Sequence, residues 1–249
     1  MSIELKDPKS KAVASWLLLG VAMTVIQIAI GGITRLTGSG LSITEWEVVT
    51  GALPPMSEAH WQELFAKYKT TAQFQLLNFD FNLANFKFIF FWEWFHRLWA
   101  RIIGLVFAFG FIYFIVKKYF KPSMIKPLVV LFLLGALQGA IGWIMVASGL
   151  EGDAVYVKPT RLALHFIFAM GLLAYTYWFA LSLKVSPIEK NSVSAEAQYK
   201  LLNIRKWAWV IITILCIQLI YGALMAGHKA ANVASTWPTI NGALVPDGL

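Results

Sequence analysis

The chain has 249 residues, of which 58% are hydrophobic and 14% are charged. Soluble globular proteins are about 45–50% apolar and about 25% charged, so this composition excludes an ordinary soluble domain. The formal net charge is +8, but the positive residues fall between apolar runs rather than on one polar face, and we therefore expect no nucleic-acid binding.

Five apolar segments are each long enough to cross a bilayer, which takes about 20 residues of helix. They cover roughly residues 13–33, 88–116, 127–147, 162–183 and 207–226. The sequence therefore predicts an all-α integral membrane protein, a polytopic helical bundle that spans the lipid bilayer.

Positive charges are concentrated in alternate connections between these segments. They precede the first segment, separate the second from the third and separate the fourth from the fifth: Lys6, Lys9, Lys11, Lys117, Lys118, Lys121, Lys126, Lys184, Lys190, Lys200, Arg205 and Lys206. Alternate connections lie on one side of a membrane, and the positive-inside rule assigns that side to the cytoplasm. We expect a multi-pass protein with a cytoplasmic N-terminus.

The longest connection, between residues 34 and 87, is expected on the outer side. Its glycines and the pair Pro54 and Pro55 indicate tight turns, and the run SEAHWQEL predicts a short amphipathic helix. Such a segment could cap a site at the outer ends of the helices. His60 in this run and His228 after the fifth segment are expected to be exposed, whereas Cys216, the only cysteine, is expected to be buried.

The chain also contains an internal repeat. A shift of 191 residues superposes the first segment and its outer loop on the fifth segment and the residues after it, and it pairs Trp16 with Trp207, Gln27 with Gln218, Gly31 with Gly222, Trp46 with Trp237 and Pro55 with Pro246. An even number of segments separates the copies, which indicates a parallel repeat. We expect residues 1–190 to form a four-helix unit and residues 191–249 to begin a second one whose remainder lies beyond residue 249; the alternative is a five-helix protein.

The second segment carries ionisable residues at the outer edge of its apolar run. Glu93 and His96 are three residues apart and share a helix face, while Arg97 and Arg101 are four apart and share another. Ionisable groups in a membrane helix are costly and by default mark function.

The fourth segment begins with Arg161 and His165, again four residues apart. At about 1.5 Å per residue, His165 and His96 lie at similar depths on parallel helices. Two such histidines can hold a haem iron between them, and the arginines can pair with its propionates. Other interpretations stay open: the histidines could only bridge helices, the arginines could extend to the interface, and Glu93 with His96 could form a proton relay.

The run GGITRLTGSGLSITEWEVVTGALPP, followed by FKFIFFWEWFHRLWARIIG, resembles the haem A synthase family, in its alphaproteobacterial, bacteroidetes-like and mitochondrial branch. QGAIGWIMVASGL, RLALHF and STWPTINGALVP match the same family in the same order, so the resemblance covers essentially the whole chain. It implies an enzyme that oxidises a methyl group of haem O to a formyl group, and thus makes haem A for cytochrome c oxidase.

The resemblance also implies an architecture and a set of roles. The family has eight transmembrane helices in two four-helix halves, of which the first binds the substrate haem and the second binds haem B. Glu93 matches the proposed catalytic glutamate, and His96 and His165 match the two iron ligands of the first half. The family's haem B ligands belong to the sixth and eighth helices, to which no residue of this chain corresponds.

Two other functions use the same residues. A di-haem cytochrome b-like membrane electron carrier would need His96 and His165 without Glu93, and a proton-coupled transporter would need all three without haem. A synthase implies haem O, a haem O synthase and an electron acceptor as partners, and a bacterial inner (plasma) membrane as its location; a homo-oligomer is compatible with the sequence.

Overall fold

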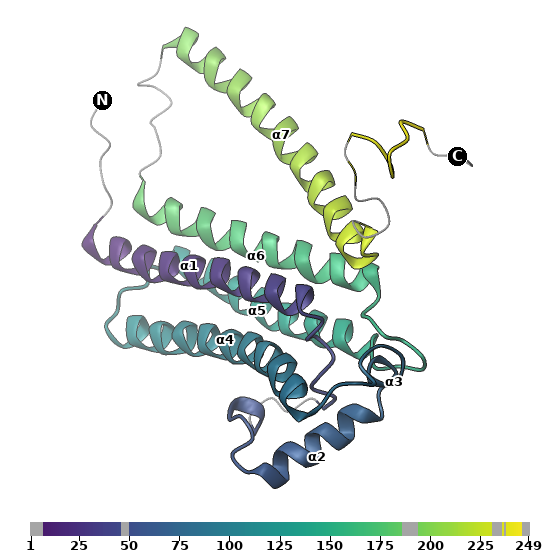
Figure 1. Ribbon diagram of the computed structural model, residues 1–249. Helices are drawn as coiled ribbons and strands as arrows, with labels where there is room; N and C mark the ends of the chain where they lie inside the picture. The colour runs from purple at the N-terminus through teal and green to yellow at the C-terminus, as the bar shows by residue number, and fades with distance from the viewer. Residues whose placement is uncertain (1–6, 46–49, 186–193, 231–235, 237, 246–249) are drawn as a thin grey trace. The chain divides into compact units, whose positions relative to one another are not determined.

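The computed structural model describes residues 7–45, 50–185, 194–230, 236 and 238–245. The regular structure in these ranges is helical: α1 (Pro8–Leu36), η1 (Thr50–Ala52), α2 (Glu58–Lys69), α3 (Ala72–Leu77), α4 (Leu83–Val116), α5 (Pro122–Ala147), α6 (Pro159–Lys184) and α7 (Ala195–Gly227). Helices α1, α4, α5, α6 and α7 are long and apolar enough to span a membrane, which confirms the five segments expected from the sequence (Figure 1).

Each spanning helix begins before its apolar run because polar residues or proline start it. Asp7 caps α1, accepting a hydrogen bond from the Ser10 N–H at 3.0 Å, with Pro8 at the first helical position. Asn82 and Asn85 form a reciprocal capping box at the start of α4. These caps place the charged residues of α4 in the second to sixth turns of the helix rather than at its end.

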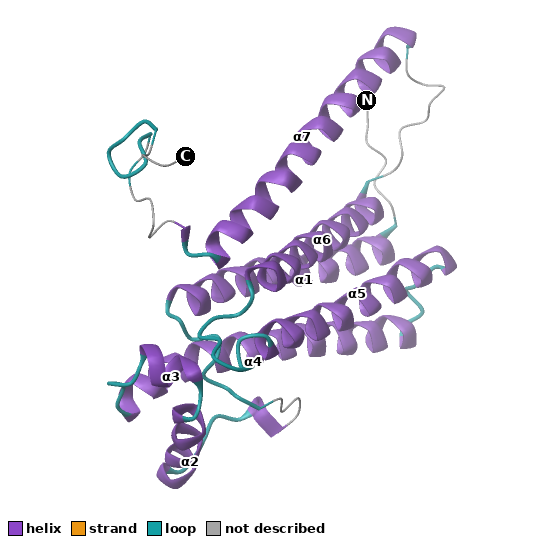
Figure 2. Ribbon diagram, turned by 90° about the vertical axis from the view of Figure 1, so that its right-hand side faces the viewer, coloured by secondary structure: helices purple, strands orange, loops and turns teal. Residues whose placement is uncertain are grey.

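The described residues form two compact units, one of residues 1–157 with 168–187 and one of residues 158–167 with 188–249. In the first unit, α1, α4 and α5 run side by side (Figures 1 and 2). Many large apolar side chains on the spanning helices are exposed, for example Phe109, Phe132 and Ile211. Such exposure is expected of helices whose outer surfaces face lipid.

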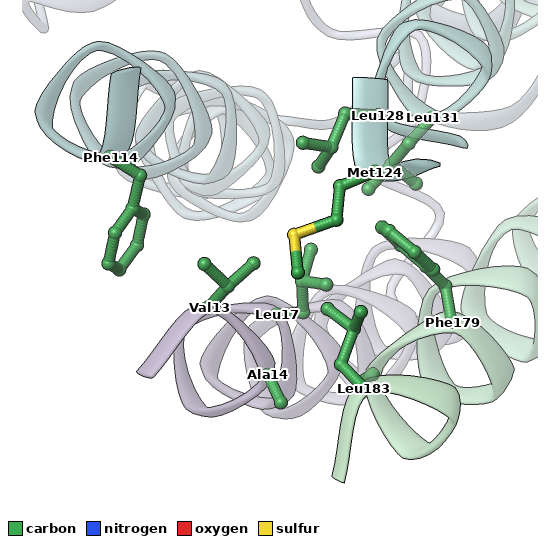
Figure 3. Close-up of a cluster of buried hydrophobic side chains, with 10 residues drawn as sticks. Val13, Ala14, Leu17, Phe114, Met124, Leu128, Leu131, Phe179 and Leu183 are labelled. Atoms are coloured by element: carbon green, nitrogen blue, oxygen red, sulfur yellow. The ribbon is translucent and has the colours of Figure 1, made fainter. Parts of the chain in front are cut away.

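The first unit has its main hydrophobic core at the ends of the helices that the positive-inside rule assigns to the cytoplasm. Figure 3 shows Val13 and Leu17 of α1 meeting Phe114 of α4, together with apolar side chains of α5 and α6. Lys121 forms an ion pair with Asp7 at the same ends, which joins the start of α5 to the start of α1.

A second apolar cluster lies at the opposite ends of these helices, where α2 packs on α4. Phe65 and Tyr68 of α2 stack on Phe86 of α4, with ring centroids 5.1 and 5.3 Å apart. The predicted short amphipathic helix is thus confirmed as α2, capped by Ser57. Along α4 the residues from Glu93 to Arg101 lie between the two clusters, so polar groups occupy the middle of the unit.

Polar residues in and next to α3 tie α2 to the loop after α1. The Tyr68 hydroxyl is buried, donates to Gln73 Oε1 at 3.0 Å and accepts from Asn78 at 2.7 Å. The Gln73 amide donates in turn to the Gly38 carbonyl at 3.3 Å. Burial raises the pKa of Tyr68 to about 12, so its hydroxyl keeps its proton at physiological pH.

The helix ends of α1 and α7 agree with the internal repeat. Their C-caps are Thr37 and His228, which correspond under the shift of 191 residues. The next residues, Gly38 and Lys229, both have left-handed backbones, with φ of 68° and 53°. Each donates its N–H to the carbonyl three residues earlier, at 3.4 and 3.2 Å. The two copies therefore share a turn as well as a helix, although the second copy places lysine where glycine is less strained.

His60 and His228 are exposed, as expected. The expectation that Cys216 is buried is wrong, because it is exposed on α7. A small apolar side chain on a spanning helix can face lipid at no cost, so burial in protein does not follow from its apolar surroundings in the sequence.

Candidate functional site

The charged residues of α4 meet the loop that follows α1. Glu93 is 3% exposed, and its Oε2 atom accepts three hydrogen bonds: from the Ser42 N–H at 2.7 Å, the Ser42 hydroxyl at 2.7 Å and the Ile43 N–H at 2.9 Å. Consecutive backbone N–H groups of this kind form a small anion-binding concavity. The loop therefore fixes the orientation of the Glu93 carboxylate.

Arg97 completes the surroundings of this carboxylate. Its Nη2 lies 2.5 Å from Glu93 Oε1 and 3.3 Å from the Ile43 carbonyl, and its Nη1 lies 3.5 Å from the Glu45 carbonyl. Pairing and hydrogen bonding together compensate for the burial of both charges. Sequence spacing had placed Glu93 and Arg97 on separate faces, but they are four residues apart and form an ion pair across one turn.

His96 lies at the contact between α4 and α1. The amide nitrogen of Gln27 is 3.1 Å from His96 Nδ1, 3.2 Å from His96 Nε2 and 3.1 Å from the His96 carbonyl oxygen. Gly31, one turn further along α1, is so near that a Cβ there would lie 3.0 Å from His96 Cε1. The imidazole thus rests on a glycine surface of α1, and the Gln27 amide contacts both of its ring nitrogens.

Hydrogen bonds from side chains to backbone carbonyls fix α4 against α1 on either side of His96. The Thr34 hydroxyl donates to the Trp92 carbonyl at 3.2 Å, and the Trp99 indole donates to the Met23 carbonyl at 2.9 Å. Because these bonds lie one turn before and about one turn after His96, they determine which face of α4 the histidine occupies.

The remaining sequence candidates lie on two helices. Arg101 is half-buried, one turn beyond Arg97 on α4. Arg161 and His165 are half-buried, one turn apart in the first three turns of α6, and belong to the second compact unit. The structure thus brings together Glu93 and Arg97 within one unit, while the pairing of His96 with His165 on one iron is a proposal taken up below.

Sequence inspection did not single out Gln27 or Ser42 as site residues. Gln27 did carry a signal, because it is a polar residue inside an apolar run and it recurs as Gln218 in the repeat. Ser42 carried no such signal. Two of the three hydrogen bonds to Glu93 Oε2 are donated by the backbone N–H groups of Ser42 and Ile43, and such groups do not depend on residue type.

Comparisons with known proteins point to one family. The family model described as "Cytochrome oxidase assembly protein" matches residues 14–249. The chain is 44% identical to the heme A synthase of Flavobacterium psychrophilum over 93% of its own length and 66% of that protein. It is 42% identical to the heme A synthase of Parvibaculum lavamentivorans over 100% of its length and 69% of that protein.

A third relative is the heme A synthase of Paracoccus denitrificans, to which the chain is 43% identical over 94% of its length and 61% of that protein. The chain thus spans 61 to 69% of the length of these three relatives. No solved structure matches it significantly.

Proposed function

Because the chain belongs to the haem A synthase family of cytochrome oxidase assembly proteins, we propose that it oxidises a methyl group of haem O to a formyl group and so makes haem A. The observation that carries this proposal is the oriented, buried Glu93 carboxylate three residues from His96 on α4. An electron carrier needs no such carboxylate. The protein is a multi-pass membrane protein of an enzyme family that acts on haem.

In this function, His96 and His165 would ligate the iron of the substrate haem, because imidazole nitrogen is a common haem ligand. Arg101 and Arg161 would pair with the propionates of the substrate. Arg97 was predicted to do the same, but its ion pair with Glu93 supports a different assignment: it orients the carboxylate and keeps at most part of its guanidinium for the substrate.

The two oxygens of Glu93 have different tasks in this proposal. Oε2 accepts three hydrogen bonds from the loop, whereas the hydrogen bond from Arg97 is received by Oε1. Oε1 receives one hydrogen bond where Oε2 receives three, so Oε1 has the capacity left to act in the reaction. There it could take a proton from attacking water or stabilise positive charge on the methyl carbon.

The overall change is balanced by one water and a four-electron acceptor. The methyl group is hydroxylated twice, and the resulting diol loses water to leave the formyl group, so that R–CH3 and one water give R–CHO, four protons and four electrons. The electron acceptor and the haem O synthase that supplies the substrate are the partners that this reaction requires.

A resident haem B does not fit the residues present. A site with two histidine ligands needs two histidines, and His228 is the only histidine after His165 in the sequence. His228 is exposed at the C-cap of α7. We therefore derive no step through haem B.

The proposed orientation places the site on the outer side of a bacterial inner membrane. Lysines gather at the opposite ends of the helices, where Lys9 donates to the Lys118 carbonyl at 3.4 Å and Lys121 pairs with Asp7. The positive-inside rule puts these lysines in the cytoplasm. The loop that holds Glu93 then faces outward, where the farnesyl tail of haem O could remain in lipid.

The proposal is tested by chromatography of the haems extracted from membranes of a haem O-producing host that expresses the chain. We expect haem A, and we expect its loss in the Glu93→Gln and His96→Ala variants. Low-spin haem bound to the protein with unchanged substituents would support the electron carrier instead. Protein without any haem under haem-replete conditions would support the transporter.

A further inference from the structure

We propose that Gln27 and Gly31 position the His96 imidazole for binding to iron. This inference rests on the proposed function only in taking His96 as an iron ligand. It adds two positioning residues on α1, a helix to which the family resemblance assigned no site residue.

The first observation is that a single amide nitrogen reaches both ring nitrogens of His96, at 3.1 and 3.2 Å. An atom nearly equidistant from both ring nitrogens would overlap Cε1 if it lay in the ring plane, so the amide nitrogen lies over the face of the imidazole. The amide therefore does not occupy the in-plane lone pair that iron would bind, and it fixes the tilt of the ring against α1.

The second observation is that the Oε1 atom of Gln27 is buried and has no hydrogen-bond partner among the described residues. Buried polar atoms without a partner are rare in proteins. The amide nitrogen of Gln27 also lies 3.1 Å from the His96 carbonyl oxygen, so both the ring and the backbone of His96 contact this one side chain. A glutamine with one buried, unsatisfied atom beside a histidine favours a positioning role over simple packing.

Gly31 makes this arrangement possible by keeping the ring close to α1. Gly31 has no side chain to separate its Cα from the ring. A Cβ at this position would lie 3.0 Å from Cε1 and 3.5 Å from Nδ1 of His96. By contrast, nothing lies within 4 Å of a Cβ placed at Gly32. The two adjacent glycines thus form a matched pair, of which one contacts the histidine.

The internal repeat supports a joint role for the two residues. Gln27 and Gly31 are one helical turn apart, and both recur at the same spacing as Gln218 and Gly222. Glutamine is not required for a membrane helix, so its recurrence four residues before a glycine favours a function that needs both.

The experiment is a spectroelectrochemical titration of the purified full chain in detergent, loaded with haem O. The wild-type protein should show a low-spin haem spectrum that the His96→Ala variant loses. Gln27→Leu removes the contacts that fix the tilt of the ring, so it should shift the reduction potential and weaken the low-spin spectrum. Gln27→Glu places a negative charge beside the imidazole and should shift the potential downward.

The glycine pair provides the second measurement. Gly31→Ala should displace the imidazole, shift the potential and weaken the low-spin spectrum, while Gly32→Ala should leave both unchanged. If Gln27→Leu does not fold, Gln27→Met has a similar length, lacks both polar atoms and should change the potential and the spectrum in the same way.

Two outcomes separate this inference from the proposed function. A His96-dependent haem whose potential is the same in wild type and in the Gln27 variants overturns the inference and leaves the proposed function intact. Absence of any His96-dependent haem in the wild-type protein overturns the proposed function, and the inference with it.

Discussion

The backbone N–H of Ser42 lies 2.7 Å from Oε2 of Glu93 and joins the loop after α1 to the outer part of α4. The Ser42 hydroxyl binds the same oxygen at the same distance, and the Ile43 N–H adds a third bond at 2.9 Å. The carboxylate is thereby held with Oε2 toward the loop and Oε1 toward Arg97. A group that must act on a substrate is thus oriented before the substrate arrives.

Replacing Ser42 with alanine should lower the rate of haem A formation about tenfold without loss of bound haem. The change removes one of the three donors to Oε2, and a hydrogen bond to a charged group is worth about 1.5–3 kcal/mol, of which the two remaining backbone bonds retain a part. The ratio of haem A to haem O in membrane extracts measures the effect. Ser15→Ala is the control, because that exposed hydroxyl donates only within α1. A Ser42→Ala variant as active as wild type would show that the Ser42 hydroxyl is not needed to orient Glu93.

Replacing Glu93 with glutamine should abolish haem A formation while haem O stays bound. Glutamine keeps the shape of the side chain, but its NH2 group is a donor, so either Ser42 or Arg97 loses its acceptor, and the amide cannot take a proton. Proton transfer by a positioned side chain contributes about 10²–10⁴-fold, so at least a hundredfold loss is expected. Glu63→Gln on the exposed face of α2 is the control. Formyl formation at the wild-type rate would exclude Glu93 from the chemistry.

Hydropathy and buried charge predicted the spanning helices and the residues of α4. An apolar run of sufficient length has few alternatives to a helix in a bilayer, and Glu93, His96 and Arg97 are unusual inside one. The helix starts were less predictable, since α4 begins five residues before its apolar run because Asn82 and Asn85 cap it. Local caps decide such boundaries and leave little trace in hydropathy.

The partners of the site residues were harder to predict from sequence. Glu93 is held mostly by backbone N–H groups, and any residue but proline has one, so Ser42 and Ile43 carry no distinctive pattern. Gln27 could have been found through its recurrence in the repeat, but its contact with His96 depends on the rotation of α1 against α4. That rotation is set by packing, for which the sequence gives no direct rule.

Replacing Gly110 with alanine should destabilise the first unit by about 1–3 kcal/mol, the usual cost of overpacking. A Cβ at Gly110 would lie 2.1 Å from Trp16 Nε1, and the indole cannot move freely because it donates to the Val106 carbonyl at 3.1 Å. Thermal unfolding in detergent measures the change. Gly104→Ala is the matched control on the same helix, since nothing lies within 4 Å of a Cβ there. Equal unfolding temperatures for the two variants would mean that α1 and α4 do not approach this closely.

The stability of the region formed by α2 and α3 should fall at high pH because of Tyr68. Burial raises the pKa of its hydroxyl from 10 to about 12; a hydrogen bond from Asn78 opposes the shift and the charge of Glu93 adds to it. Above pH 10 the unfolded chain loses this proton while the folded protein keeps it, so the contribution is complete below pH 10 and is lost progressively toward pH 12. One pKa unit corresponds to about 1.4 kcal/mol, which sets an upper limit of about 2–3 kcal/mol.

Unfolding in detergent at pH 8, 10 and 11 measures this loss. The free energy of unfolding of the wild-type protein should fall more steeply above pH 10 than that of a Tyr68→Phe variant, which has no proton to lose. Tyr199→Phe, at an exposed position on α7, is the control and should keep the wild-type slope. Identical slopes for wild type and Tyr68→Phe would show that the hydroxyl titrates alike in the folded and unfolded states, and therefore that α2 and α3 do not bury it.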